Sequence, residues 1–160
     1  MRFASFTASG VDRNSTGYQE YLESIKERLP SKARSFVTCD WYYDPTDHRC
    51  PHDSWVETLT VSEPALGERK EVRSLCLTVQ LLGAYHDGHV EFVYDRVTAY
   101  SIEMPKSNRA AQNQGHGDWL FDEIMLMEDG TVQHEVVFSL GGSWLIQSND
   151  ISHAWVPFRR

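Results

Sequence analysis

This chain of 160 residues has few cysteines and no long hydrophobic run. Its three cysteines (Cys39, Cys50 and Cys76) are an odd number, and Cys76 lies in an apolar segment. This pattern argues against a disulfide framework and favours a reducing compartment. No apolar stretch approaches the ~20 residues of a membrane-spanning helix. The first ten residues also lack the apolar core of a signal peptide. The sequence therefore predicts a soluble, cytoplasmic protein with no membrane partner.

Basic residues are missing from most of the C-terminal third. No Lys or Arg lies between Arg109 and Arg159, and the whole chain carries a formal net charge of −8. A nucleic-acid-binding surface needs a basic footprint, so we expect no nucleic-acid partner. The imbalance favours a basic protein partner or a cation, although a solvated acidic face that only maintains solubility is the alternative. The acidic residues of this interval are Asp118, Asp122, Glu123, Glu128, Asp129, Glu135 and Asp150.

Recognisable catalytic motifs are missing as well. The sequence contains no serine nucleophile elbow, no phosphate-binding loop and no HExxH pair. We therefore expect no cofactor, and a non-enzymatic role is favoured over an enzymatic one.

Sulfur and imidazole groups, which zinc prefers, gather at Cys39, His48, Cys50 and His52. Their spacing differs from that of structural zinc sites, in which ligands come in pairs about two to four residues apart. We predict no metal site, and these four residues are the expected ligands if zinc is bound. His86 and His89 flank a predicted turn but lack a third ligand.

Hydrophobic periodicity predicts an α+β protein with one domain over residues 1–160. Tyr18, Tyr21, Leu22, Ile25 and Leu29 recur at helical spacing, which predicts a helix over about 17–29 that ends at Pro30. Alternating segments from about 36 to 156, beginning with residues 36–43, predict roughly eight antiparallel strands. We expect a curved antiparallel sheet or partly open barrel, built as a meander, with the N-terminal helix packed on its back. The polar segment 105–117 is predicted to be a long loop, either functional or disordered.

Two glycine-containing turns predict the pairing of the last three strands. Asp129-Gly130 and Gly141-Gly142 are typical of two-residue hairpin turns, because both central residues of such turns need positive φ. In the register that follows, Glu123 faces Val136, and both lie on the same face as His134.

This register predicts a polar cluster inside an aromatic cup. Glu123 and His134 lie diagonally on the predicted face, and a carboxylate beside an imidazole can form a binding pocket or an acid–base pair. The alternative is that these groups are solvated near the sheet end or form one satisfied buried pair. The expected cup comprises Trp119, Phe121, Glu123, His134, Phe138, Gln147 and Asn149.

Several short runs resemble a pattern in small uncharacterised bacterial β-rich proteins. The runs are residues 101–104 (SIEM), 117–124 (GDWLFDEI), 128–130 (EDG) and 134–138 (HEVVF), so the resemblance covers the C-terminal third to half. Some of those proteins are immunity-like, lying near toxin or secretion loci. The resemblance implies a partner-binding role and carries over no catalytic residue.

Two functions follow as expectations. The first is a non-enzymatic interaction protein comparable to those immunity factors. The acidic surface of this chain would bind a basic protein, and exposed aromatic residues of this chain would anchor the contact. The second is a small-ligand-binding cup, or a minor enzyme, centred on Glu123 and His134. For the first function, the expected contact residues are Asp118, Asp122, Glu128, Asp129, Glu135, Trp144 and Trp155.

Overall fold

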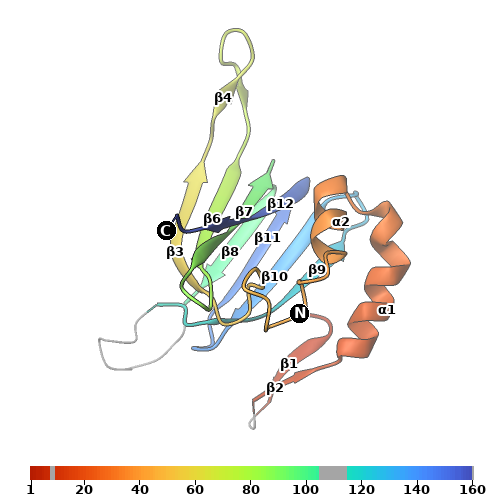
Figure 1. The fold of residues 1–160 in the computed structure, drawn as a ribbon. Helices are drawn as coiled ribbons and strands as arrows, with labels where there is room; N and C mark the ends of the chain where they lie inside the picture. Colours follow the sequence, from red (N-terminus) through yellow and green to blue (C-terminus); the bar gives the residue numbers. More distant parts are fainter. Residues whose placement is uncertain (8–9, 105–114, 160) are drawn as a thin grey trace.

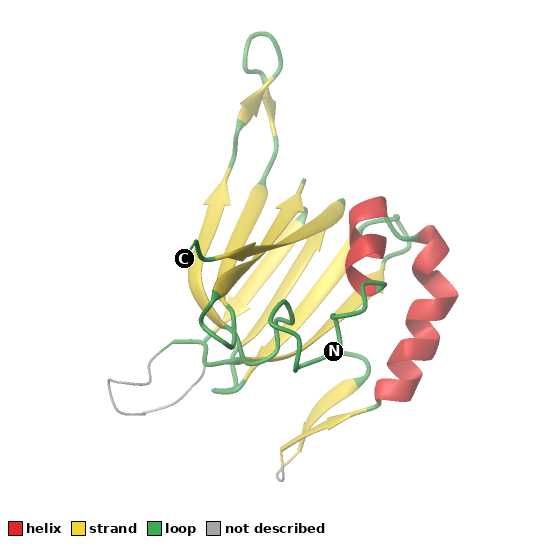
Figure 2. Ribbon diagram, in the orientation of Figure 1, coloured by secondary structure: helices red, strands yellow, loops and turns green. Residues whose placement is uncertain are grey.

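The chain folds into an α+β structure in which two antiparallel sheets enclose an aromatic core (Figures 1 and 2). The computed structural model describes residues 1–7, 10–104 and 115–159. The predicted α+β fold, a curved antiparallel sheet with an N-terminal helix, is confirmed. Within the described residues no helix is long and apolar enough to span a bilayer. The predicted loop over 105–117 lies largely outside the described residues.

The elements follow one another with the helices near the N-terminus. They are β1 (Ala4–Thr7), β2 (Gly10–Arg13), α1 (Ser15–Ile25), the 3-10 turn η1 (Lys26–Arg28), α2 (Ser31–Val37), β3 (Trp55–Ser62), β4 (Ala65–Leu66), β5 (Val72–Arg73), β6 (Cys76–Leu82), β7 (Gly88–Asp95), β8 (Ala99–Glu103), β9 (Trp119–Leu126), β10 (Val132–Phe138), β11 (Ser143–Ser148) and β12 (Asp150–Pro157).

Helix α1 begins where the Asn14 side chain accepts a hydrogen bond from the Gly17 N–H at 2.9 Å. Its apolar stripe docks against strand β9, which is an edge of its sheet, rather than across the back of the sheet. The Tyr18 hydroxyl accepts a hydrogen bond from the Ile124 N–H at 2.5 Å, and the Tyr21 hydroxyl accepts one from the Leu126 N–H at 3.0 Å. The helix therefore satisfies edge groups that are otherwise open to another strand.

Helix α2 occupies part of the segment for which the sequence predicts a strand, so the strand over 36–43 is wrong. Pro30 precedes the helix, and the Asp150 carboxylate accepts hydrogen bonds from the N–H groups of Lys32 and Ala33 at 3.2 and 2.9 Å. This capping group comes from β12, at the other end of the sequence. The apolar pattern reflects burial against the sheet, because Phe36 is fully buried and its ring centroid lies 5.1 Å from that of Phe92.

The two main sheets face each other. One has the strand order β12-β7-β6-β3 and the other β8-β11-β10-β9. Phe92 of the first sheet stacks on Trp119 of the second, with centroids 5.5 Å apart and planes 6° from parallel. A single bridge between Trp55 and Asp118 joins the start of β3 to the start of β9. The space between the sheets is filled with side chains and forms a packed core.

The predicted register of the last three strands is wrong. Each turn contains three residues instead of two, with the glycine at the final position, as in a turn followed by a glycine bulge. Gly130 has φ +84° and donates to the Met127 carbonyl at 3.0 Å; Gly141 has φ +91° and donates to the Phe138 carbonyl at 2.9 Å. The first turn is one residue longer than predicted, and the second covers residues 139–141 in place of 141–142, so the two pairings move by one and by three positions. Both shifts are odd, so each exchanges the faces of the strands that it joins.

The observed pairing places Asp122 opposite Val136, Glu123 opposite Glu135 and Ile124 opposite His134. Even-numbered residues of β10 and β11 therefore point into the core, as do those of β9 from Asp122 onward. An irregularity in the pairing between Val137 and Phe138 returns Trp119 to the interior face.

A slender arm leaves the body between β3 and β6 and projects away from it (Figure 1). It is closed by β4 and β5, which pair only at Ala65 with Arg73 and at Leu66 with Val72. The apolar side chains of Leu66 and Val72 are 49% and 51% exposed. The arm thus contributes no buried residue to the core.

Candidate functional site

The predicted cup does not form, because Glu123 and His134 lie on opposite faces of the sheet. His134 is fully buried between the sheets, whereas Glu123 pairs with Glu135 on the other face. The Glu123 carboxylate is only 1% exposed and accepts hydrogen bonds from the N–H groups of Arg2 and Phe3 at 2.7 and 2.9 Å. Its observed role is to hold the N-terminal segment on the sheet.

The remaining predicted cup residues are divided in the same way. Trp119 and Phe138 lie in the core, but Phe121 and Gln147 are on the opposite face from His134. Asn149 lies between β11 and β12, where its N–H donates to the Asp95 carbonyl at 3.0 Å. The odd-numbered shifts of register account for this division.

The predicted partner-contact residues do not lie together on one surface. Asp122 and Trp144 are 6% and 1% exposed, so neither side chain can contact a partner protein on the surface of this conformation. Glu135 receives the amino group of Met1. The remaining positions are Glu128 and Asp129, exposed at the β9–β10 turn; Asp118, at the other end of β9; and Trp155, half-buried over Gly83 and Gly88.

Of the four sulfur and imidazole residues, Cys50 and His52 line one small cavity, but Cys39 and His48 do not join them. Cys50 is buried, with its thiol 3.7 Å from the Tyr42 carbonyl, whereas His48 is exposed and contacts Asp87 at 2.6 Å. The Cys39 thiol donates to the Phe36 carbonyl at 2.8 Å. Among the residues that the structure describes, no group of three or more His, Cys, Asp or Glu is placed to hold a metal ion.

The site with the most concentrated chemistry surrounds Asp122. The Tyr42 hydroxyl donates to Oδ2 of this carboxylate, and Nε2 of His134 lies 3.1 Å from the same oxygen. Nε1 of Trp119 donates to the other oxygen, Oδ1, at 3.2 Å. Strand β9 supplies the carboxylate and the indole, β10 the imidazole, and the segment after α2 the phenol. All four side chains are at least 94% buried, as their exposed fractions of 6%, 3%, 0% and 1% show.

The hydrogen-bond chain fixes where the proton of His134 resides. The fully buried Tyr94 hydroxyl lies 2.8 Å from Nδ1 of His134 and needs an acceptor for its own proton. Nδ1 accepts that proton, so the ring carries its N–H on Nε2 and donates it to Asp122. His134 is then neutral, and the Asp122 carboxylate has three neutral donors and no cationic partner. Burial is the main cause that raises the pKa values of Tyr42 and Tyr94, so both phenols remain protonated donors.

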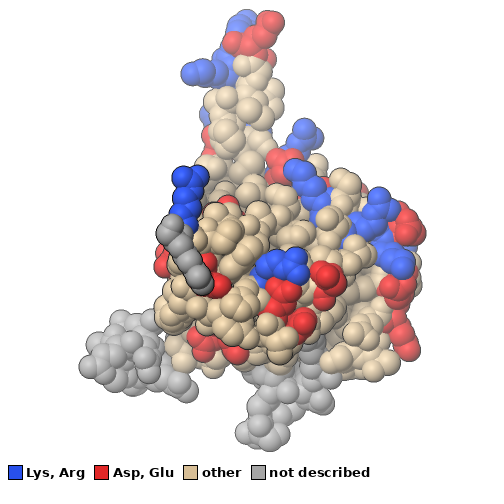
Figure 3. Space-filling model, in the orientation of Figure 1, with Lys and Arg blue, Asp and Glu red and all other residues tan. Residues whose placement is uncertain are grey.

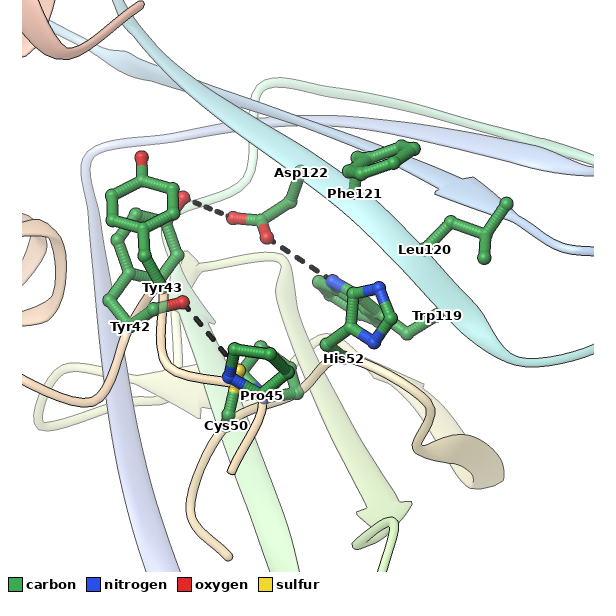
Figure 4. Close-up of a pocket in the computed structure, with 10 residues that line it drawn as sticks. Tyr42, Tyr43, Pro45, Cys50, His52, Trp119, Leu120, Phe121 and Asp122 are labelled. Carbon is green, nitrogen blue, oxygen red and sulfur yellow. Dashed lines mark hydrogen bonds between the residues drawn. The ribbon is translucent and has the colours of Figure 1, made fainter. Parts of the chain in front are cut away.

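A small cavity opens on this carboxylate, which we call the Asp122 pocket (Figure 4). Its volume is about 50 Å³, and it is partly open to solvent. Asp122 lies between Tyr42 and Tyr43 on one side and His52 and Trp119 on the other. The lining residues are Tyr42, Tyr43, Pro45, Cys50, Pro51, His52, Trp119, Leu120, Phe121 and Asp122.

No known relative guides the assignment. Comparison of the chain with protein-family models, curated proteins and solved structures finds no match. The function must therefore be argued from the pocket itself.

The pocket combines aromatic surface with a single negative charge. No Lys or Arg lines it, and Tyr42 and Tyr43 lie with their ring centroids 4.2 Å apart. The Cys50 thiol is inert as a nucleophile at neutral pH, because burial raises its pKa to about 11. The arrangement can bind a small cation through the carboxylate and the ring faces.

Sequence reasoning missed this site for a specific reason. From the sequence, Asp122 is assigned to an exposed, partner-binding acidic surface, so its burial is not expected. One signal was available, because Asp122 shares its alternation with Ile124 and Leu126, and a carboxylate among apolar residues of one face needs partners. Tyr42 and Tyr94 could not be connected to it, since they lie 80 and 28 positions away in the sequence and their proximity depends on the tertiary fold.

Proposed function

We propose that this chain is a non-enzymatic binding protein that recognises a basic protein partner and accepts one of its cationic side chains in the Asp122 pocket. The observation that carries the proposal is a buried carboxylate, hydrogen-bonded to Tyr42, Trp119 and His134, at the wall of a pocket that is partly open to solvent and lined by no Lys or Arg. An ionised carboxylate without a cationic neighbour is costly to bury, and a cation arriving in the pocket lowers that cost.

The walls of the pocket fit the same class of ligand. The faces of aromatic rings carry negative electrostatic potential, so Tyr42, Tyr43 and Trp119 attract an ammonium or guanidinium group. An anion would meet the Asp122 charge, and an uncharged group would gain nothing from it. The net charge of −8 adds a long-range attraction for basic proteins.

The size of the pocket favours the end of a side chain over a free ligand. A cavity of about 50 Å³ can hold a group of a few heavy atoms. Drug-sized and cofactor-sized ligands occupy pockets of roughly 300–1,000 Å³. The rest of the binding energy must therefore come from surfaces around the pocket, as in a complex between two proteins.

The Tyr94–His134–Asp122 chain has the same order of groups as a nucleophile–base–carboxylate relay. Tyr94 is fully buried, however, and its hydroxyl bonds to His134 inside the core. A nucleophile must be accessible to its substrate, and the buried Tyr94 hydroxyl is not accessible. The chain therefore supports a role in holding Asp122 in place, and binding is favoured over catalysis.

The face of the molecule in Figure 3 shows acidic and basic side chains interspersed over the body. That face shows no broad acidic patch, and the proposal rests on the local site. All three cysteines are free thiols, which supports a reducing compartment such as the cytoplasm.

The proposal is tested by NMR titration with N-methylguanidinium and with uncharged acetamide of similar size. We expect N-methylguanidinium to shift the Trp119 indole N–H resonance saturably, because this group donates to Asp122, and acetamide to leave it unchanged. An arginine-rich peptide should bind more tightly than the isolated head group. Equal responses to the cation and to acetamide, or no response to either, contradict the proposal.

Matched variants separate the pocket from general charge. Tyr43→Ala removes one pocket wall at a position that is 37% exposed, and Tyr100→Ala removes an equally large ring at a position that is 45% exposed and outside the pocket. We expect weaker binding of N-methylguanidinium in the first variant and unchanged binding in the second. Equal loss in both variants contradicts a role for the pocket.

A further inference from the structure

The open edge of strand β3 is a second surface without a partner. In its sheet β3 is the last strand, and within the described parts of the chain only Trp55, at its start, is bridged on the outer side. Beyond that bridge, the backbone from Thr58 to Ser62 pairs with β6 on one side only. Such an edge presents unpaired N–H and C=O groups, which a further strand can bind.

Beyond the irregularity between Val56 and Thr58, this edge lacks the charged residues and prolines that normally prevent such pairing. Residues 58–62 read Thr-Leu-Thr-Val-Ser, with no charge, no proline and high β propensity. Strand β9, an edge of the other main sheet, differs, because α1 covers it and places tyrosine hydroxyls at the N–H groups of Ile124 and Leu126. The edge at β9 is therefore protected, whereas the edge at β3 is open.

The arm that follows β3 gives a second indication. An isolated two-stranded hairpin is marginally stable at best, and β4 and β5 share only two residue pairs away from the body. Its exposed apolar residues Leu66 and Val72, together with Val61 on β3 at 44% exposure, suit burial against another surface. The arm therefore has few stabilising contacts within this chain, and we expect further contacts to come from another molecule.

We propose that a second copy of this chain pairs with β3 in antiparallel fashion about a two-fold axis, joining the two sheets edge to edge. Antiparallel pairing of one strand with its own copy is self-complementary, as a two-fold interface requires. With the axis near Thr60, Pro64 of one copy reaches the level of Val56 in the other. Proline has no N–H to donate, so pairing ends just before the edge that Asp118 already occupies.

The arm finds complementary chemistry in this arrangement. It passes the start of β3 in the other copy, where the Trp55 ring is 42% exposed and offers an apolar contact for Leu66. The arm carries Arg69, Lys70 and Arg73, balanced by Glu63, Glu68 and Glu71. The region near Trp55 holds the acidic side chains Asp53, Glu57 and Asp118 without a lysine or arginine between positions 50 and 68. Exposed apolar groups therefore meet along one path, where the three basic side chains of the arm can face these acids.

The test is the mass of the protein in solution, measured by light scattering and sedimentation over a range of concentrations. Wild-type protein is expected to be dimeric. Thr60→Lys places a charge on the edge beside its own copy, and should raise the dimer dissociation constant by about tenfold or more, because like charges oppose each other. Thr78→Lys is the matched control, since Thr78 is exposed and lies directly across β6 from Thr60.

Circular dichroism checks that both variants remain folded. A dimer in Thr78→Lys and a monomer in Thr60→Lys support the proposal. A wild-type chain that stays monomeric at every concentration overturns it, as do equal masses for the two variants. The double variant Leu66→Ser and Val72→Ser tests the arm without altering the core, and is expected to weaken the dimer; an unchanged dissociation constant contradicts the part assigned to the arm.

Discussion

Replacing Tyr94 with phenylalanine tests the proton arrangement on which the charge of the Asp122 pocket depends. The substitution removes one hydroxyl and keeps the ring. In the structure this hydroxyl bonds to Nδ1 of His134, and both groups are fully buried. After the substitution Nδ1 is a buried acceptor without a donor. Moving the ring proton to Nδ1 does not help, because the bare Nε2 would then face the Asp122 carboxylate.

The expected cost follows from this loss. A buried polar atom left without its partner costs about 1–3 kcal/mol. For a chain of this size the melting temperature should fall by about 2–12 °C, at about 2–4 °C for each kcal/mol. Tyr100→Phe is the matched control, since Tyr100 is 45% exposed and its hydroxyl can bond to water. The control should change the free energy of unfolding by less than about 0.5 kcal/mol.

Urea denaturation followed by tryptophan fluorescence measures both variants. In the wild type, ¹⁵N NMR of the His134 ring reports directly which nitrogen carries the proton, and Nε2 is expected to carry it alone. Equal stability of the Tyr94 and Tyr100 variants refutes the reasoning. A ring with both nitrogens protonated refutes it too, because Asp122 would then be neutralised within the core and would have little attraction for a cation.

Further expectations concern other parts of the fold. Asp150→Ala should cost about 0.5–2 kcal/mol, because its carboxylate caps α2, and amide exchange should increase first in residues 31–37. Glu123→Gln should increase amide exchange at Arg2 and Phe3, whose N–H groups bond to that carboxylate. Hydrogen bonds to Arg49 are the main cause that lowers the pKa of Asp47 to about 2. The stability that the ionised carboxylate contributes is fully present at pH values above the ordinary pKa of an aspartate, and it is lost as the pH falls toward 2. Arg49→Gln should return that pKa, followed by NMR titration, toward the usual value. Thiol alkylation should be slowest at Cys50, which is 3% exposed and has its pKa raised to about 11 by burial.

The fold class could be predicted from periodicity, whereas the pairing could not. The Tyr18, Leu22 and Ile25 stripe is helical in the structure, and alternation in residues 119–148 marks three strands. Turn length is harder to read, because Asp129-Gly130 is compatible with both a two-residue and a three-residue turn. Here the Asp129 carboxylate accepts hydrogen bonds from the N–H and hydroxyl of Thr131, which holds the longer form.

Local patterns also failed where distant residues determine the structure. The segment beginning at Phe36 has the composition of a strand, yet α2 ends at Val37 inside it. Its carboxylate cap is supplied by Asp150, and its buried face rests on β7 and β12. A short window of sequence contains neither contact. The same holds for the Asp122 site, whose donors come from three separate parts of the chain.

The carboxylate that caps α2 also constrains the order in which the molecule can form. Because Asp150 stands 117 positions after Ala33, this helix lacks its closing contact until residue 150 has been synthesised. Helix α2 should therefore mature late, after the strands between have paired. A ribosome-bound chain that stops before β12 would expose the aromatic side of this segment, and chaperones would be expected to recognise it there.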